Sequence, residues 1–290
     1  MYLKEITKKI LPETVSRRIK TYKDKQEKFY NEIKLLNGKK IDRNTTKSVL
    51  FFTTHKCAST YMGKCIRYIN GKYLNLTHLD FMLYLWMYSN QDTFQLLENK
   101  KSIVFYPEGM LYSPLRKYVP VPEIDQYCIL LMLRDPRDVI VSEYFSVAYS
   151  HVLSPHKMRK EELLNRRSQV QKMTVDEYAL EKAKHYQQVY SEYCNHLIKA
   201  QNIKFLRYED FMQNFNFWIQ QLEDCLKISI SEEDRDRLYE LKGGDAEIIE
   251  NKLKHIRKGT PGDYKNKLTE ETQDFLNSKF KEILLTLNYE

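Results

Sequence analysis

The sequence lacks the features of several protein classes. Among its 290 residues are only 8 glycines and 8 prolines, and no repeat divides it, so we expect one domain rather than several joined by flexible linkers. The longest apolar runs, residues 81–88 and 128–133, are far shorter than the roughly 20 residues that cross a membrane. The N-terminus has no uninterrupted apolar stretch, which argues against a signal peptide and favours a cytoplasmic protein.

Cysteine is also scarce. The five cysteines are odd in number and widely spaced, and none forms a C-x-x-C pair. Neither a disulfide framework nor a zinc knuckle is indicated, and a reducing compartment fits best. No cluster of His, Cys and Asp has the spacing of metal ligands, so we expect no metal.

Charge, by contrast, is plentiful and unbalanced. The chain has 47 Lys and Arg against 39 Asp and Glu, which gives a net charge of +8. Such a balance favours an anionic partner: a nucleotide, a sulfated or phosphorylated glycan, a nucleic acid or an acidic membrane surface. Charge alone does not choose among them.

Three short apolar runs, residues 48–54, 127–133 and 202–206, have the pattern of buried strands in a parallel sheet. Helical stretches separate them, so the sequence predicts an α/β fold with helices flanking a parallel sheet. We expect a single domain over residues 1–290, in which residues 1–47 form a helical lead-in and residues 48–290 the core.

The first predicted strand runs into the segment TTHKCASTY. A loop between a strand and a helix in such a fold can hold a phosphate, and Lys56, Ser59 and Thr60 supply a cation and two hydroxyls. Ala58 and Cys65 stand where a Mg²⁺-dependent phosphate loop would need a glycine and a hydroxyl, which argues against a nucleotide triphosphatase. The alternatives are a polar helix start without a ligand and an activated Cys57 thiol.

The second predicted strand ends at Arg134, and the helix after it carries Ser142. Asp135 can cap this helix and Pro136 can open it. Arg134 and Ser142 can share a second anion, whereas Arg137 and Asp138 can equally form a surface ion pair. The helix that follows the first predicted strand is expected to stop at Asn70 and Gly71. A later helix is expected to begin with a capping box formed by Thr174 and Glu177.

Three segments carry a resemblance to sulfotransferases that use 3′-phosphoadenosine 5′-phosphosulfate (PAPS). LRDPRDVIVSEYFS resembles the 3′-phosphate segment of that family, and HKCASTY resembles its 5′-phosphosulfate loop, PKxGTTW. His55, Ala58 and Tyr61 replace the proline, a glycine and the tryptophan of the loop. The segment HIRKGTPGDYKNKLT resembles the signature RKGxxGDWKN, with Tyr264 in the position of the tryptophan.

The resemblance implies a three-layer fold like that of P-loop nucleotide triphosphatases, and transfer of a sulfuryl group that leaves adenosine 3′,5′-bisphosphate. It assigns the 5′-phosphosulfate to the loop and the catalytic charge to Lys56, and it places Tyr208 beside the adenine with Tyr61 as a stacking face. The implied nucleotide-binding residues are Lys56, Cys57, Ala58, Ser59, Thr60, Tyr61, Arg134, Ser142, Tyr208, Arg257, Lys258 and Gly259.

The general base is left open between His78, Glu108 and another residue. His78 lies in LTHLD, at the position of a catalytic glutamate in Golgi-type members. The local sequence is closer to the KTHLP of cytosolic members. Glu108 lies in VFYPEGM, after an expected strand nearer to Arg134. His151 is expected at the surface, and residues 81–88 either in the core or along an acceptor cleft.

The acceptor is a hydroxyl or amine compound of unknown identity, a carbohydrate or a small molecule. Two rival functions remain: a nucleotide kinase, which would need Mg²⁺, and a basic nucleic-acid-binding module.

Overall fold

The computed structural model describes residues 24–89, 91–242 and 260–289. The chain divides into two compact units, residues 1–42 and residues 43–290. The first contains the helix α3 (Tyr30–Leu36). The second contains all strands of the sheet and is the subject of the sections below. Whether residues 1–290 act as one domain stays a prediction.

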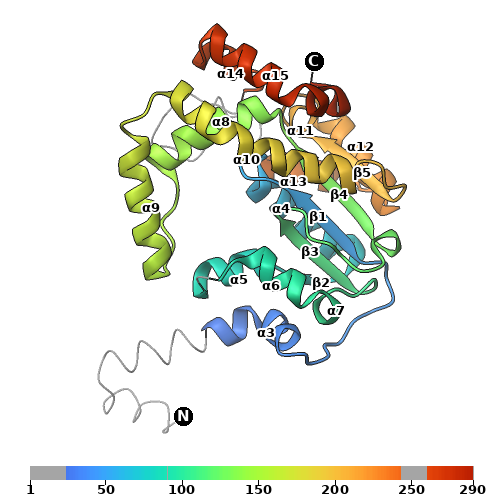
Figure 1. The fold of residues 1–290 in the computed structure, drawn as a ribbon. Coiled ribbons are helices and arrows are strands. Elements are labelled where there is room, and N and C mark those ends of the chain that lie inside the picture. Colours follow the sequence, from blue (N-terminus) through green and yellow to red (C-terminus); the bar gives the residue numbers. More distant parts are fainter. Residues whose placement is uncertain (1–23, 90, 243–259, 290) are drawn as a thin grey trace, which may run out of the picture. The chain divides into compact units, whose positions relative to one another are not determined.

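The second unit is built on a five-stranded sheet in the order β2-β3-β1-β4-β5 (Figure 1). Every neighbouring pair is parallel. The strands are β1 (Val49–Thr53), β2 (Thr77–Leu79), β3 (Met110–Leu115), β4 (Cys128–Leu133) and β5 (Ile203–Arg207). This confirms the predicted α/β class and the three predicted strands.

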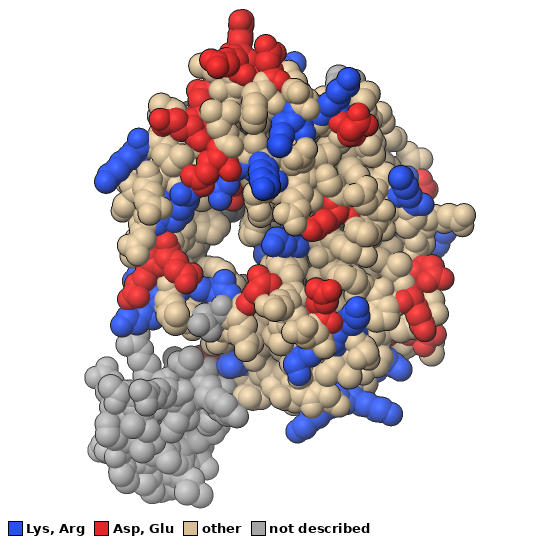
Figure 2. Space-filling model, viewed as in Figure 1, with Lys and Arg blue, Asp and Glu red and all other residues tan. Residues whose placement is uncertain are grey.

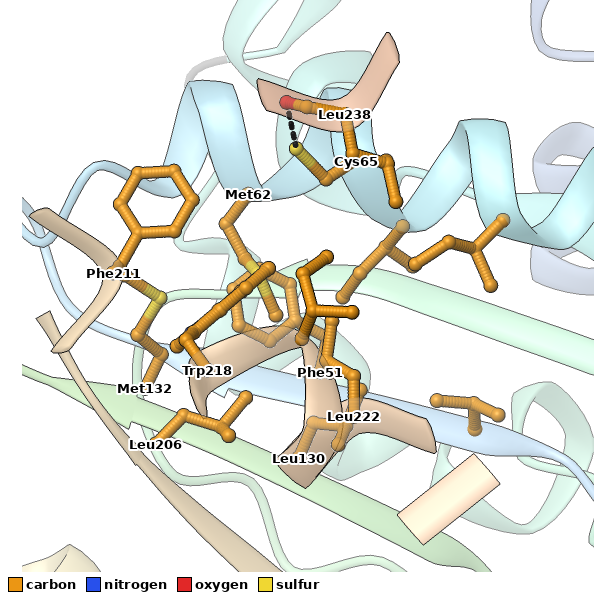
Figure 3. Close-up of a cluster of buried hydrophobic side chains, with 14 of the residues drawn as sticks. Phe51, Met62, Cys65, Leu130, Met132, Leu206, Phe211, Trp218, Leu222 and Leu238 are labelled. Atoms are coloured by element: carbon orange, nitrogen blue, oxygen red, sulfur yellow. Dashed lines mark hydrogen bonds between the residues drawn. The ribbon is translucent and has the colours of Figure 1, made fainter. Parts of the chain in front are cut away.

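Helices cover both faces of the sheet. On one face, α4 (Ser59–Ile69), α12 (Phe215–Leu226) and α13 (Glu232–Lys242) enclose an apolar cluster with the strands. Figure 3 shows Phe51, Leu130 and Trp218 at its centre. On the other face, α10 (Val175–His196) packs on β1, where Tyr193 hydrogen-bonds to the carbonyl of Thr53. α8 (Pro136–Phe145) and α15 (Glu270–Leu287) pack against α10.

Two helix starts follow the predicted capping. The side chain of Asp135 accepts a hydrogen bond from the amide of Arg137, and Pro136 is the first residue of α8. Thr174 and Glu177 form the predicted capping box of α10. Both patterns pair amides that the helix itself leaves without partners.

The expected helix stop at Asn70 is wrong. α4 continues as a π-helical turn, η1 (Asn70–Leu74). The Asn70 side chain then donates to the carbonyl of Leu76 at 2.8 Å and accepts from its amide at 2.9 Å. Asn70 therefore fixes the turn that leads into β2 instead of ending the helix.

The remaining elements connect these layers. α5 (Phe81–Tyr88), α6 (Thr93–Asn99) and α7 (Lys101–Val104) lie between β2 and β3, and η2 (Ile124–Gln126) precedes β4. η3 (Ser146–Ser150) and α9 (Lys157–Val170) follow α8, whereas α11 (Tyr208–Gln213) follows β5 and α14 (Tyr264–Lys267) precedes α15. In the part of the chain described, every helix is too short or too polar to cross a bilayer.

Candidate functional site

A cavity of about 780 Å³ opens at the carboxyl ends of the strands. Figure 2 shows an opening on this side of the molecule, with both basic and acidic side chains along its margin. Parallel strands bring the loops that follow them to one edge of the sheet, which is where such folds bind ligands. Eight of the residues predicted to form the site line this cavity: Lys56, Ala58, Ser59, Thr60, Tyr61, Arg134, Ser142 and Tyr208.

The loop after β1 forms the middle of the cavity wall. Its backbone has positive φ angles at Lys56 (64°) and Ala58 (52°), and the second of these turns the chain into α4. The first amides of a helix have no partner within it and carry a partial positive charge. The loop therefore presents amides, hydroxyls and the Lys56 cation to one space.

Cys57 lies beneath this loop and does not line the cavity. Burial raises the pKa of its thiol to about 12. A thiol that keeps its proton at neutral pH is a poor nucleophile. The hypothesis of an activated Cys57 thiol is therefore wrong, although the backbone of Cys57 remains part of the loop.

Arg134, which directly follows β4, is a buried cation of the cavity wall. It is 6% exposed, its guanidinium lies 4.5 Å from the centre of the Tyr208 ring, and its Nη2 donates to the Thr260 carbonyl at 3.4 Å. Its Nε is buried without a hydrogen-bond partner among the described residues. A buried N–H that lacks a partner costs free energy unless a ligand pairs with it.

Asp138 connects this cation to a distant part of the chain. Its carboxylate lies 3.2 Å from Nη2 of Arg134 and accepts hydrogen bonds from the amides of Gly262 at 2.7 Å and Tyr264 at 2.9 Å. Arg137 pairs instead with Asp135. The interpretation of Arg137 and Asp138 as a surface ion pair is therefore wrong, because both are buried and bind other partners.

The predicted ligands Arg257, Lys258 and Gly259 lie outside the described residues. The segment that follows them is described, and its first residue, Thr260, lines the cavity. The bonds of Asp138 to Gly262 and Tyr264 hold this segment beside Arg134.

Arg116 is a cavity residue that sequence reasoning missed. It follows β3, lines the cavity, and donates from Nε to the Ser59 hydroxyl at 3.3 Å. Burial lowers its pKa and the nearby Asp80 opposes this shift, but a guanidinium stays charged in proteins. Its signal in the sequence is weak, because a proline such as Pro114 within β3 disfavours the prediction of a strand.

The two base candidates lie in different places. His78, in β2, is half-buried, and its Nε2 donates to the Ser113 carbonyl at 3.0 Å. Burial lowers its pKa. It does not line the cavity, but the strand that contains it ends at the same sheet edge.

Glu108 is exposed and precedes β3. The expected strand before it is wrong, because that stretch is the helix α7. Since parallel strands all point the same way, Glu108 lies at the amino-terminal edge of the sheet, and the structure does not bring it to the cavity.

Two other histidines do line the cavity, His55 and His151. The expected surface position of His151 is therefore wrong. The His55 side chain is exposed to the cavity. The surrounding protein lowers its pKa to about 3, and the nearby Arg116, His151 and Lys56 contribute in the same direction. His55 is thus a neutral imidazole beside Lys56.

Comparison with known proteins supports a relationship over most of the chain. The model of the sulfotransferase domain family matches residues 32–286. Among solved structures, a mouse sulfotransferase (SULT7A1) complexed with PAP is 16% identical, with a TM-score of 0.56 over 87% of this chain and 89% of its own. A retinol dehydratase complexed with retinol and PAP is 18% identical, with a TM-score of 0.47 over 87% and 84%.

None of the curated proteins compared with the sequence is similar to it at a significant level. The mouse structure supports the three-layer fold. The family match extends from within α3 through the sheet and the cavity loops to α15. The chain therefore belongs to the sulfotransferase domain family.

Proposed function

We propose that the protein transfers a sulfuryl group from PAPS to a hydroxyl or amine acceptor and releases adenosine 3′,5′-bisphosphate. One observation carries the proposal: the loop after β1 and the residues after β4 and β5 line the same cavity. The first two segments resemble the 5′-phosphosulfate and 3′-phosphate sites of PAPS-dependent sulfotransferases, and Tyr208 after β5 matches the tyrosine beside the adenine. A volume of about 780 Å³ is in the range of small-molecule sites.

The two ends of the nucleotide would bind to residues that follow different strands. The loop from Lys56 to Tyr61 would hold the 5′-phosphosulfate, with Ser59 and Thr60 as donors. Arg134 and Ser142 would hold the 3′-phosphate, and the buried Nε of Arg134 gains a partner there. Tyr208 and Tyr61 would flank the adenine. Arg257, Lys258 and Gly259 complete the 3′-phosphate site as predictions from sequence.

The reaction needs little covalent chemistry from the protein. Sulfuryl transfer, like phosphoryl transfer, passes through a loose transition state in which positioning and charge neutralisation dominate. Lys56 would stabilise the charge that develops on the oxygen of the leaving nucleotide. Arg116, which donates to the Ser59 hydroxyl, adds a second cation beside the same loop.

The acceptor proton needs a base within hydrogen-bond reach. His78 uses Nε2 as a donor to Ser113, so its Nδ1 is left as the acceptor, and His55 lines the cavity directly. We assign the base to this pair of neutral imidazoles. Acceptor-saturated turnover in His78→Asn and His55→Asn identifies which one acts; a large loss of rate in Glu108→Gln alone would contradict the assignment.

Thermal unfolding in the presence of three ligands tests the proposed function. Adenosine 3′,5′-bisphosphate at about 100 times its Kd should stabilise the protein by roughly 2.7 kcal/mol. Mg-ATP and single-stranded DNA should stabilise it much less. Equal or greater stabilisation by Mg-ATP would favour a kinase, and stabilisation by DNA alone would favour a nucleic-acid-binding module.

A further inference from the structure

A second half of the cavity lies beyond the residues that the proposed function assigns to the nucleotide. The residues assigned to PAPS follow β1, β4 and β5, whereas Met82, Trp86 and Phe94 come from α5 and α6, between β2 and β3. Because the strand order is β2-β3-β1-β4-β5, these residues lie on the β2–β3 side of the Lys56 loop. We call this the acceptor half.

The wall of the acceptor half is apolar. α5 buries Phe81 and Leu85 on one face, yet its other face carries Met82 and Trp86, which line the cavity. An ordinary surface helix would be polar there. With Phe94 from α6, these side chains fit a ring or another apolar body.

A cation lies at the edge of this apolar wall. Arg159, in α9, lines the cavity and donates from Nε to the Ser89 carbonyl at 2.7 Å and from Nη2 to the Gln91 carbonyl at 2.9 Å. Among the described residues, no carboxylate lies within ion-pair distance of it. Asp92, which also lines the cavity, accepts from the amides of Phe94 and Gln95 as the cap of α6.

The position of Arg159 is fixed by more than its own bonds. The hydroxyl of Ser154, just before α9, donates to the carbonyl of Trp86 at 2.8 Å, so the segment before α9 is tied to α5. His151, in the same segment, also lines the cavity. A fixed, uncompensated guanidinium beside an apolar wall is suited to a carboxylate or sulfate.

We propose that the acceptor is a hydroxyl compound with an apolar, ring-containing body and an anionic group, a carboxylate or a sulfate ester. The inference rests on the proposed sulfuryl transfer. The ring would pack on Trp86 and Met82, the anion would pair with Arg159, and the hydroxyl would point toward Lys56. Its oxygen bonds to the sulfuryl sulfur while the sulfur–oxygen bond to the nucleotide phosphate breaks. That phosphate keeps the electron pair, and the hydroxyl proton passes to the base.

Binding calorimetry on the full chain saturated with adenosine 3′,5′-bisphosphate tests this without turnover. The probes are 3-(4-hydroxyphenyl)propionate, 4-propylphenol and tyramine, which share a phenol and differ in charge. The anionic probe should bind about tenfold more tightly than the neutral one, and the cationic probe least tightly. Arg159→Gln should remove this preference, and Arg159→Lys should retain part of it.

Lys157→Gln is the matched control, because Lys157 lies in the same helix with its side chain 87% exposed. It should leave all three affinities unchanged. Preference for the neutral or cationic probe, no binding of the anionic probe, or an equal loss for all three probes in Arg159→Gln would overturn the inference while binding of the nucleotide persists. Failure of the nucleotide itself to bind would instead refute the proposed function, and this inference with it.

A separate observation concerns two cysteines far from the cavity. The sulfur atoms of Cys128, at the start of β4, and Cys225, in α12, lie 2.9 Å apart. A disulfide needs a separation of roughly 2.05 Å, so a small shift joins them. Both residues are half-buried. The contact with Cys128 lowers the pKa of Cys225, and Lys204, Lys227 and Lys47 act in the same direction.

The geometry points to a reversible disulfide between Cys128 and Cys225, formed by a peroxide. The Cys225 thiolate attacks one peroxide oxygen, which gives a sulfenic acid and hydroxide. The Cys128 thiol then displaces the sulfenic hydroxyl as water and closes the bond. With hydrogen peroxide, the intact mass should fall by two hydrogens, and the linked peptides should separate on reduction.

Cys225→Ser should abolish that loss of mass, whereas Cys194→Ser, at another half-buried cysteine, should not. The oxidised protein should also unfold at a higher temperature, because the cross-link restricts the unfolded chain. Linkage of either cysteine to another partner, or addition of oxygen to Cys225 without a cross-link, would overturn the inference.

Discussion

In the proposed reaction, Lys56 has the most direct role of any residue. Its positive φ places it in a loop between β1 and α4 rather than in either element, so its side chain can follow the leaving oxygen without disturbing the core. Arg134, in contrast, is buried and bonded on several sides. We therefore expect the two cations to act differently, one on the transition state and the other on binding.

Replacement of Lys56 by Ala should lower turnover by about 10² to 10³ and change the Kd for adenosine 3′,5′-bisphosphate much less, because the product lacks the sulfuryl group. Steady-state rates and calorimetry measure the two effects. Thr60→Ala, in the same loop, serves as the comparison. An equal loss of turnover and product affinity in Lys56→Ala would contradict a role specific to the transition state.

Ala58 is a strained residue in this loop. Its φ of 52° is left-handed, a conformation that costs a non-glycine residue roughly 1–2 kcal/mol. Ala58→Gly should relieve this strain, but the greater entropy of glycine in the unfolded chain offsets part of the gain. The free energy of unfolding should therefore rise by about 0.5–1 kcal/mol. The control Ala183→Gly, inside α10, should lower it by about 1 kcal/mol. Destabilisation by Ala58→Gly would contradict the loop geometry.

His55 should stay neutral over the working pH range, because its pKa is lowered to about 3. Histidine NMR spectra of the ligand-free protein, assigned with His55→Gln, should show no titration of this ring between pH 8 and pH 5. Adenosine 3′,5′-bisphosphate should raise the pKa, since its charge opposes that of Lys56 and Arg116. Titration near the ordinary value of about 6.5 in the free protein would contradict the lowered pKa of His55.

At the scale of elements, apolar runs predict strands well only where the strand is continuous. β1 and β4 lie inside the sheet and read as unbroken apolar segments, so they were predictable. β3 was not, since Pro114 cannot donate to a neighbouring strand. Its register with β1 shifts between Leu50 and Phe52. Because this strand was not predicted, Arg116 was not recognised as a cavity residue, and Glu108 was expected nearer to Arg134 than it lies.

Motif spacing also has a limit at this scale. The resemblance of three segments correctly indicated the family, and residues from the first two meet at the cavity. The contact of Asp138 with the amides of Gly262 and Tyr264 joins residues more than 120 positions apart. Neither periodicity nor local spacing could predict such a contact, because it depends on how α8 and the segment before α14 pack.

Replacement of Asp138 by Asn should lower the free energy of unfolding by about 3 kcal/mol or more, because it breaks a buried ion pair and weakens acceptance from the two amides. Chemical denaturation measures the change. The control is Glu240→Gln, in an exposed pair with Arg237 in α13, which should cost less than about 1 kcal/mol. Similar costs for the two variants would contradict the role of Asp138 as a buried connector.

At the scale of the whole molecule, the sheet order determines which ligands can meet. The central strand β1 has β3 on one side and β4 on the other, so its loop faces both halves of the cavity at once. In the proposed reaction the donor approaches this loop from the β4–β5 side and the acceptor from the β2–β3 side. Lys56, between them, lies where the sulfuryl group would change partners.

The most direct test of the donor site is a double-mutant cycle on the 3′-phosphate. Calorimetry would compare adenosine 3′,5′-bisphosphate with adenosine 5′-monophosphate on the wild-type protein and on Arg134→Ala, with circular dichroism to verify that both are folded. Loss of the 3′-phosphate should weaken binding to the wild type roughly 100-fold and to Arg134→Ala far less. The same loss in both proteins would show that Arg134 does not contact this phosphate, and would contradict the proposed site.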